Sequence, residues 1–342
     1  MKKLKKYLLS TLIFLITLSI VSIPFAGGII YAFNFQKISR PDYSITPGLI
    51  NYEEIKDTLP RKEIKYSSNN ATLNGYFYEN DSIDNLIIVS HGINDGADSL
   101  LFVCKYFYDL GYSVFSYDNS GSFDSTGKNE GFTQPLIDLK YTIDFLNSNE
   151  PFKDSKKLLF GFSAGGFATS AVLSFNQPNI VASVSVSAFN DSSSLLIEKG
   201  KSYVGPIVFA GKWLVDIIQN KKFGNYLNYT SIDGINNSNK PVFVAHGTND
   251  KTIRIDVDSI LAKKELITNP NFDYYLVENA GHTSVLYSNE ANLYQQEVNN
   301  KIKSIKNKQQ KIEYVNSIDD YAYSNLNEDL FNKIIQFYKN CI

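Results

Sequence analysis

The pentapeptide Gly161-Phe162-Ser163-Ala164-Gly165 decides the fold of this 342-residue chain. It follows a short apolar run at residues 158–160 and precedes an apolar stretch of helical character at residues 167–175. Between a buried strand and a helix, a G-x-S-x-G sequence forms a sharp turn that exposes the serine hydroxyl. Because glycine at both flanks permits so tight a turn, the pattern predicts that Ser163 is a nucleophile rather than part of an ordinary turn.

Short apolar runs bounded by glycine, asparagine and aspartate recur on both sides of this motif and predict buried strands. They lie at residues 86–89, 113–117, 158–160, 181–186, 242–245 and 274–277. Alternating patterns predict an antiparallel pair before them, at residues 63–67 and 73–78. Amphipathic stretches predict helices at residues 100–110, 135–146, 167–175 and 326–338. This alternation predicts an α/β fold with a mostly parallel central sheet and helices on both faces.

A serine hydroxyl needs a base within hydrogen-bond reach, and the chain has three histidines. His91 and His246 each precede a glycine at the end of a predicted strand, which is typical of residues that shape a turn. His282 lies in the loop after the last predicted strand. The chain order serine, acid, histidine therefore favours His282 as the base.

The acid that orients this histidine should lie between Ser163 and His282, at the end of a strand. Asp250 follows the run at residues 242–245 by a few positions and is the first candidate. Asp191 follows the run at residues 181–186 and is its rival.

A backbone oxyanion hole is predicted next to the serine. Its first N–H group is that of Ala164, directly after the nucleophile. Its second is that of Ile93, in the loop after the run at residues 86–89, where Gly92 permits a close approach of the backbone to a substrate.

The order of these motifs resembles the α/β-hydrolase superfamily over about residues 60–295. Residues 326–338 are similar to its closing helix. Asp118 to Ser125 resemble the loop D-x-R-G-x-G-x-S of serine aminopeptidase-like and esterase-like members, with Ser120 at the arginine position and Phe123 at the second glycine. The resemblance implies a Ser-Asp-His hydrolase that acts through an acyl-enzyme, and the departure at Ser120 weakens the inference to a peptidase.

Residues 190–239 form an interval of about fifty residues between two predicted strands, where the superfamily inserts a cap. Residues 206–218 begin with a proline and are apolar on nearly every side, which predicts a helix with a second apolar face over a substrate pocket. Phe209 or Trp213 would then line an acyl site. A helix enclosed within its own subdomain is the alternative.

Four lysines, at positions 2, 3, 5 and 6, precede a stretch without charge at residues 7–36. Its apolar core is long enough for a membrane-spanning helix, so we expect a membrane contact through residues 7–33 and the rest of the chain outside the cell. A cleaved signal peptide ending near Ala26, and thus a secreted protein, is the alternative. The expected organisation is an anchor or signal at 1–36, a stalk at 37–60 and an α/β-hydrolase domain at 61–342.

Composition excludes several other classes of protein. Lys and Arg number 33 against 35 Asp and Glu, for a net charge of −2, so no basic excess is present for nucleic acid. The chain has no G-x-x-x-x-G-K-[ST] loop, and its three histidines lack the spacing of metal ligands, so neither a cofactor nor a metal is predicted. Two cysteines, Cys104 and Cys341, exclude a disulfide framework and leave one bridge open.

The sequence thus predicts a membrane-tethered serine hydrolase of the carboxylesterase or lipase kind. It would cleave the carboxylic ester or thioester of a small-molecule or acyl-bearing substrate. A serine aminopeptidase-like peptidase and a non-catalytic binding protein on the same fold are the alternatives. Competent residues at all three positions of the triad disfavour the binding protein.

Overall fold

The centre of the computed structural model, which describes all residues except 1–2, 4, 15–16, 18–34, 36 and 49, is an eight-stranded sheet. The strand order is β1-β2-β4-β3-β5-β6-β7-β8. The strands are β1 (Lys62–Ser68), β2 (Ala71–Tyr78), β3 (Asn85–Ser90), β4 (Ser113–Tyr117), β5 (Lys156–Phe162), β6 (Ile180–Val186), β7 (Val242–Gly247) and β8 (Phe272–Val277). β2 pairs antiparallel with β1 and β4, and every other pairing is parallel. All eight predicted strands are confirmed.

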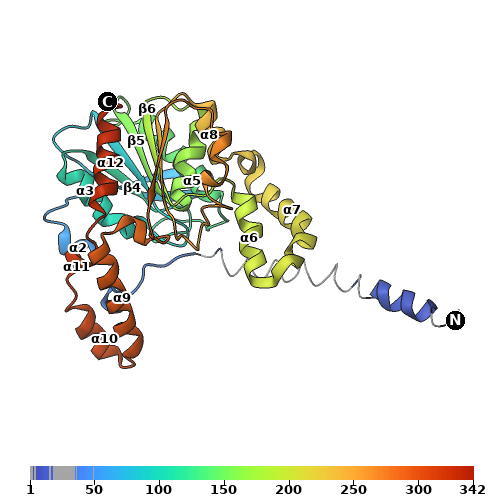
Figure 1. Ribbon diagram of the computed structural model, residues 1–342. Helices are drawn as coiled ribbons and strands as arrows, with labels where there is room; N and C mark the ends of the chain where they lie inside the picture. The colour runs from blue at the N-terminus through green and yellow to red at the C-terminus, as the bar shows by residue number, and fades with distance from the viewer. Residues whose placement is uncertain (1–2, 4, 15–16, 18–34, 36, 49) are drawn as a thin grey trace.

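Helices cover both faces of this sheet (Figure 1). One face packs against α3 (Leu101–Asp109) and α12 (Glu328–Lys339), and the other against α4 (Gln134–Ser148), α5 (Ala164–Ala171) and α8 (Ser231–Asn237). Along β3, Ile87 and Val89 contribute to the first core, and Leu86 and Ile88 to the second. Side chains of a strand alternate between faces, so a strand buried on both sides is apolar throughout. The four predicted helices are confirmed, with the end of the third forming a 3-10 turn, η3 (Val172–Phe175).

The two cysteines belong to the α3 and α12 side of the molecule. Cys104 is buried in α3, and Cys341 follows α12 and is partly buried. Both are free thiols, so the bridge that the sequence left open is not formed.

The interval between β6 and β7 contains α6 (Ser192–Val204), η4 (Gly205–Gly211), α7 (Lys212–Phe223), η5 (Gly224–Asn228) and α8. The pair α6 and α7 projects from the domain (Figure 1). In contrast, α8 packs on α5, where a Cβ atom on Gly234 would lie 2.1 Å from the Ser170 carbonyl oxygen. The projecting part of the cap is thus narrower than residues 190–239.

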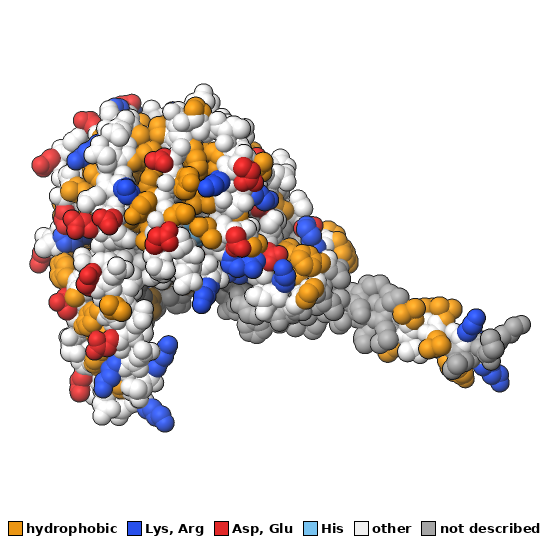
Figure 2. Space-filling model, viewed as in Figure 1, with side chains coloured by type: hydrophobic (Ala, Val, Ile, Leu, Met, Phe, Trp, Pro, Cys, Tyr) orange, Lys and Arg blue, Asp and Glu red, His pale blue; other side chains and the backbone are white. Residues whose placement is uncertain are grey.

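The continuous helix predicted at residues 206–218 is instead divided between η4 and α7, with a glycine at each end of η4. Glycine is the weakest helix former after proline, which favours a break at these positions. Phe209 and Trp213 are 50% and 54% exposed. Figure 2 shows hydrophobic side chains on the surface of the cap beside lysines. The expectation that Phe209 or Trp213 lines an acyl site stays a prediction.

The segment predicted as a stalk packs against the domain. It contains η1 (Tyr43–Ile45) and α2 (Tyr52–Ile55). Ile50, Ile55 and Leu59 are buried in the core beneath α3 and α12. The burial of these three apolar side chains attaches residues 50–59 to the fold.

Three further helices lie between β8 and α12, namely α9 (Asn289–Ser304), α10 (Lys308–Val315) and α11 (Asp320–Tyr323). They project from the domain as a solvated group, with Ala291 and Val298 as the buried residues of α9 (Figure 1). Short 3-10 turns complete the fold at η2 (Ala97–Leu100), η6 (Ile260–Leu266) and η7 (Ser284–Leu286).

The predicted membrane contact at residues 7–33 falls mostly outside the described residues. Of that stretch, residues 7–14 belong to a helical segment at 5–14. Among the described residues, no helix has both the length and the apolar character needed to cross a bilayer.

Candidate active site

Ser163 occupies a strained turn between β5 and α5. Its backbone has φ 56° and ψ −116°, a left-handed conformation that a side chain disfavours and that is concentrated at functional sites. A Cβ atom on Gly161 would lie 2.2 Å from the Gly165 carbonyl oxygen, and one on Gly165 would lie 2.0 Å from the Ser90 carbonyl oxygen. The two glycines are thus required because the turn packs backbone against backbone.

His282 joins this serine to a carboxylate. Its Nε2 lies 3.0 Å from the Ser163 Oγ, and its Nδ1 lies 2.7 Å from the Asp250 Oδ2. The loop that carries His282 is tied to the end of β6, because the Ser187 hydroxyl donates to the His282 carbonyl oxygen at 3.1 Å. With Nδ1–H donating to the carboxylate, Nε2 is available to accept the serine proton.

The Asp250 side chain is fully buried after β7. Its Oδ1 accepts the backbone N–H groups of Thr252 at 2.7 Å and Ile253 at 2.8 Å. The Nε2 of His246 lies 3.4 Å from Oδ2. Burial alone would raise the pKa of Asp250, but hydrogen bonds from His246 and His282 outweigh it and hold this pKa below its ordinary value. The carboxylate is therefore ionised at neutral pH.

Asp191 has a different part in the structure. It is the N-cap of α6, where its Oδ1 accepts the backbone N–H of Ser194 at 2.6 Å. Of the two acids that the sequence offered, the structure brings Asp250 to His282.

The loop after β3 lies next to the serine. A Cβ atom on Gly92 would lie 3.4 Å from the Ser163 Cβ. The backbone of this loop therefore runs beside the serine, and Ile93 is its next residue. Ala164 begins α5 on the other side. The two N–H groups predicted as an oxyanion hole thus come from segments that meet at Ser163.

His91 holds this loop in place, although its position at a strand end predicted only a residue that shapes a turn. The side chain is buried, its Nδ1 lies 2.7 Å from the Gly92 carbonyl oxygen, and its Nε2 accepts the backbone N–H of Asn119 at 3.0 Å. Asn119 belongs to the loop after β4, so His91 connects two loops at the edge of the sheet. Both bonds require a neutral ring with its proton on Nδ1.

Acidification should therefore lower the free energy of unfolding, because the buried His91 ring has to stay neutral in the folded protein. Burial lowers the pKa of His91 from 6.5, so below that pH the unfolded chain binds a proton that the folded chain excludes. We expect the free energy of unfolding of the wild type, relative to His91→Gln, to decrease below about pH 6.5 by up to about 1.4 kcal/mol per pH unit. Denaturant unfolding between about pH 5 and 8 measures this, and a constant difference between the two proteins would contradict it.

Within the described part of the chain, no cluster of three or more His, Cys, Asp or Glu side chains is arranged to hold a metal ion.

Comparisons with known proteins agree with this architecture. Residues 81–233 match the model of a family described as serine aminopeptidase, S33, a range that includes Ser163 and ends before Asp250. The comparison with curated proteins gives no match.

Solved structures supply a broader likeness. An esterase from Pyrococcus furiosus is 20% identical, with a TM-score of 0.55 over 79% of this chain and 97% of that chain. An α/β hydrolase from a Penicillium species is 16% identical, with a TM-score of 0.51 over 70% of this chain and 97% of that chain. The chain therefore has the α/β-hydrolase fold, and over residues 81–233 it is similar to the serine aminopeptidase family.

Proposed function

We propose that the protein is a membrane-tethered serine hydrolase that cleaves a carboxylic ester or thioester through an acyl-enzyme. The observation that carries the proposal is the hydrogen-bonded series from Asp250 through His282 to Ser163, with the serine on a strained turn at the start of α5. A nucleophile, its base and the group that orients the base are the three parts that such catalysis needs.

Acylation uses these residues in order. Ser163 Oγ attacks the acyl carbon while its proton passes to Nε2 of His282, and the carbonyl oxygen takes the negative charge. The N–H groups of Ala164 and Ile93 donate to that oxygen. When the intermediate collapses, the bond from the acyl carbon to the leaving oxygen or sulfur breaks, and Nε2 returns its proton to the leaving group.

Deacylation repeats the steps with water as the nucleophile. His282 accepts a water proton at Nε2, the hydroxyl adds to the acyl carbon, and the bond to Ser163 Oγ breaks as the proton returns to the serine. Throughout, Asp250 stays ionised and stabilises the imidazolium that forms twice in each turnover.

A peptidase is the second candidate, and one observation favours it: the family matched at residues 81–233 is described as serine aminopeptidase. The Pyrococcus furiosus relative is an esterase and covers more of the chain, which favours ester cleavage. Half-exposed Phe209 and Trp213 would suit an apolar acyl chain that reaches the cap.

A labelling and turnover experiment tests the proposal on the full chain in detergent. A fluorophosphonate probe should label the wild type at Ser163, and p-nitrophenyl esters of increasing acyl length should be hydrolysed faster than aminoacyl amides. Ser317→Ala, at an exposed serine after α10, is the matched control and should label like the wild type. Faster cleavage of the amides would favour the peptidase, and an unlabelled, inactive folded protein would favour a binding role.

Membrane tethering through residues 7–33 is part of the proposal and has its own test. The support is a charge-free stretch after four lysines, which would place the domain outside the cell. We expect the full chain to sediment with membranes and to resist washing with high salt, which removes proteins held by charge alone. A mature N-terminus near Gly27 would instead identify a cleaved signal peptide.

A further inference from the structure

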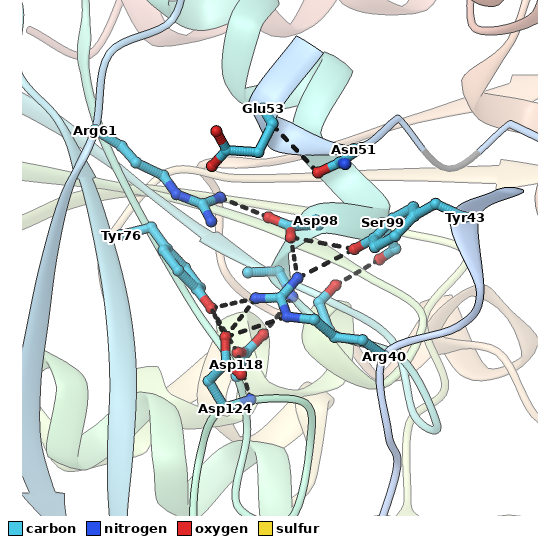
Figure 3. Close-up of polar contacts among 12 residues, drawn as sticks. Arg40, Tyr43, Asn51, Glu53, Arg61, Tyr76, Asp98, Ser99, Asp118 and Asp124 are labelled. Atoms are coloured by element: carbon cyan, nitrogen blue, oxygen red, sulfur yellow. Dashed lines mark hydrogen bonds and ion pairs between the residues drawn. The ribbon is translucent and has the colours of Figure 1, made fainter. Parts of the chain in front are cut away.

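Residues 37–48 form a strap that lies against two loops of the candidate site. Ile38 forms a bridge with Ser122 in the loop after β4, its N–H donating to the Gly121 carbonyl oxygen at 2.8 Å and its carbonyl oxygen accepting the Phe123 N–H at 2.8 Å. Two residues later, Arg40 extends between that loop and the loop after β3 (Figure 3). The strap therefore connects both loops to the chain that precedes the fold.

The Arg40 guanidinium uses all three of its nitrogens. Nη1 bonds to the Asp98 carboxylate and, at 3.1 Å, to the Tyr43 hydroxyl. Nη2 donates to Asp124 Oδ2 at 2.6 Å and to the Tyr76 hydroxyl at 2.7 Å. Nε donates to the same Asp124 oxygen at 3.1 Å. One side chain thus links Asp98, at the end of the first loop, to Asp124, at the end of the second.

Asp98 is the buried centre of this network. Its side chain is 2% exposed, and its second oxygen accepts from Nη1 of Arg61 at 2.6 Å. The chain has only three arginines, and two of them converge on this carboxylate. Arginine presents a planar fork of donors that lysine cannot replace, so their choice in a lysine-rich chain indicates a demand for fixed geometry.

The same network also binds the backbone of the loop after β3. Asp118 accepts the Ala97 N–H at 2.8 Å on one oxygen and the Tyr76 hydroxyl at 2.9 Å on the other. A Cβ atom on Gly96 would lie 2.2 Å from the Phe123 ring, which itself lies 4.9 Å from the Arg40 guanidinium carbon. The loop is therefore pinned at residues 96–98.

The other end of this loop meets the nucleophile. Gly92 lies against Ser163, and Ile93 follows it. Asp98 lies five positions after Ile93, so a shift at the pinned end can move the N–H proposed for the oxyanion hole. A misplacement of about 1 Å in a reacting geometry can reduce the rate by about 100-fold.

The second loop has no cation of its own from residue 118 to residue 127. Ser120, which stands where the resembling loop has an arginine, bonds to Asp138 through its N–H and its hydroxyl, each at 2.8 Å. Arg40 supplies a guanidinium to the same loop from outside it.

We propose that Arg40 is a positioning residue for the oxyanion hole, and that the strap is therefore a working part of the site. The inference rests on the proposed function, because it assigns Arg40 an effect on that site. Release of the strap would slow the chemical step and leave substrate binding intact, because Arg40 acts on Ile93 through Asp98 and contacts no proposed catalytic atom.

The test compares Arg40→Gln and Arg40→Lys in the full chain with Lys308→Gln as control. Lys308 pairs with Asp42 of the strap at 3.4 Å through an exposed side chain, a contact worth little. We expect Arg40→Gln to lower kcat by about 10- to 100-fold with KM changed by less than about threefold, and Arg40→Lys to recover part of the loss. Lys308→Gln should match the wild type.

Arg40→Gln should fold, because Asp98 keeps Arg61 and the Asp124 side chain is 47% exposed. Asp124→Asn is the second variant, since it retains the pair with Asp98 and weakens only the link to the second loop. It should lower kcat in the same direction by a smaller factor. If kcat of both variants stays within about twofold of the wild type, the proposal is overturned.

Amide hydrogen exchange separates this proposal from the proposed function. In Arg40→Gln, the amides of residues 91–97 should exchange faster than in the wild type, while those of the central strands should not change. Unchanged exchange at 91–97 overturns the strap's role even if the protein proves to be no hydrolase. Conversely, an unlabelled Ser163 in the wild type overturns the function whatever the exchange shows.

Discussion

Ser163→Ala should lower kcat by about 10⁴- to 10⁶-fold, with KM nearly unchanged. The variant lacks the Oγ that attacks the substrate and that lies 3.0 Å from Nε2 of His282. Alanine accepts this turn at no greater backbone cost than serine, because both carry a Cβ at φ 56°. The folded protein should thus bind substrate and fail to form an acyl-enzyme.

His282→Ala should be about as damaging, and the double variant should be little worse than either single one. The two residues act as a unit, since an unassisted hydroxyl is a weak nucleophile and a base without its nucleophile has nothing to activate. Steady-state hydrolysis of the best p-nitrophenyl ester measures both effects. Additive losses in the double variant would show that Ser163 and His282 act separately.

Thermal unfolding supplies the control for these variants, because a lost fold would also abolish activity. Ser163 contributes one short side chain, so Ser163→Ala should keep the wild-type Tm within a few degrees. Undiminished esterase activity in this folded variant would contradict the assignment of the nucleophile.

The sheet was predictable from local pattern alone. Each central strand is a short apolar run bounded by turn residues, because a strand with helices on both faces buries every side chain. β3 illustrates this, since Leu86 to Val89 divide alternately between the two cores. The nucleophile was predictable for a related reason, because Gly161 and Gly165 meet backbone atoms that exclude any Cβ.

For the acid that orients His282, the sequence offered two candidates. Asp250 and Asp191 both follow strands that end at the same edge of the sheet, so chain order does not separate them. What separates them is local structure: Asp191 caps a helix, and Asp250 receives two backbone N–H groups that direct its other oxygen to His282.

The strap had no signal in the sequence. Its key contact joins Arg40 to Asp98, 58 residues away, and a single arginine before a proline belongs to no periodic pattern that would indicate its partner. Ile50 likewise gives no signal, because it lies five residues before Ile55, a spacing that fits neither a strand nor a helix, and Ile55 and Leu59 alone are too few to predict a helix. Burial of such isolated side chains depends on the shape of a surface that forms only when distant segments meet.

Asp250→Asn should lower kcat by about 10⁴-fold, as expected when the orienting acid of a triad becomes an amide. The amide oxygen can still accept the N–H groups of Thr252 and Ile253, which the carboxylate binds at 2.7 and 2.8 Å. The amide nitrogen then faces Nδ1 of His282 with its own hydrogens. Nδ1 must accept from it, so the ring proton moves to Nε2.

This tautomer is the cause of the loss. With a proton on Nε2, His282 donates to Ser163 Oγ and cannot accept the serine proton, although every heavy atom keeps its place. The variant should therefore retain the wild-type KM and fold. Its residual rate should also exceed that of Ser163→Ala, because the minor tautomer of the imidazole still supports turnover.

Asp191→Asn is the matched control, since asparagine caps a helix about as well as aspartate. The α6 cap that Asp191 forms with the Ser194 N–H should survive, and kcat should change by less than about tenfold. The same ester assay ranks the two variants. A reversed order, with Asp191→Asn the slower enzyme, would move the acid to the end of β6 and would mean that the contact between Asp250 and His282 does not orient the base.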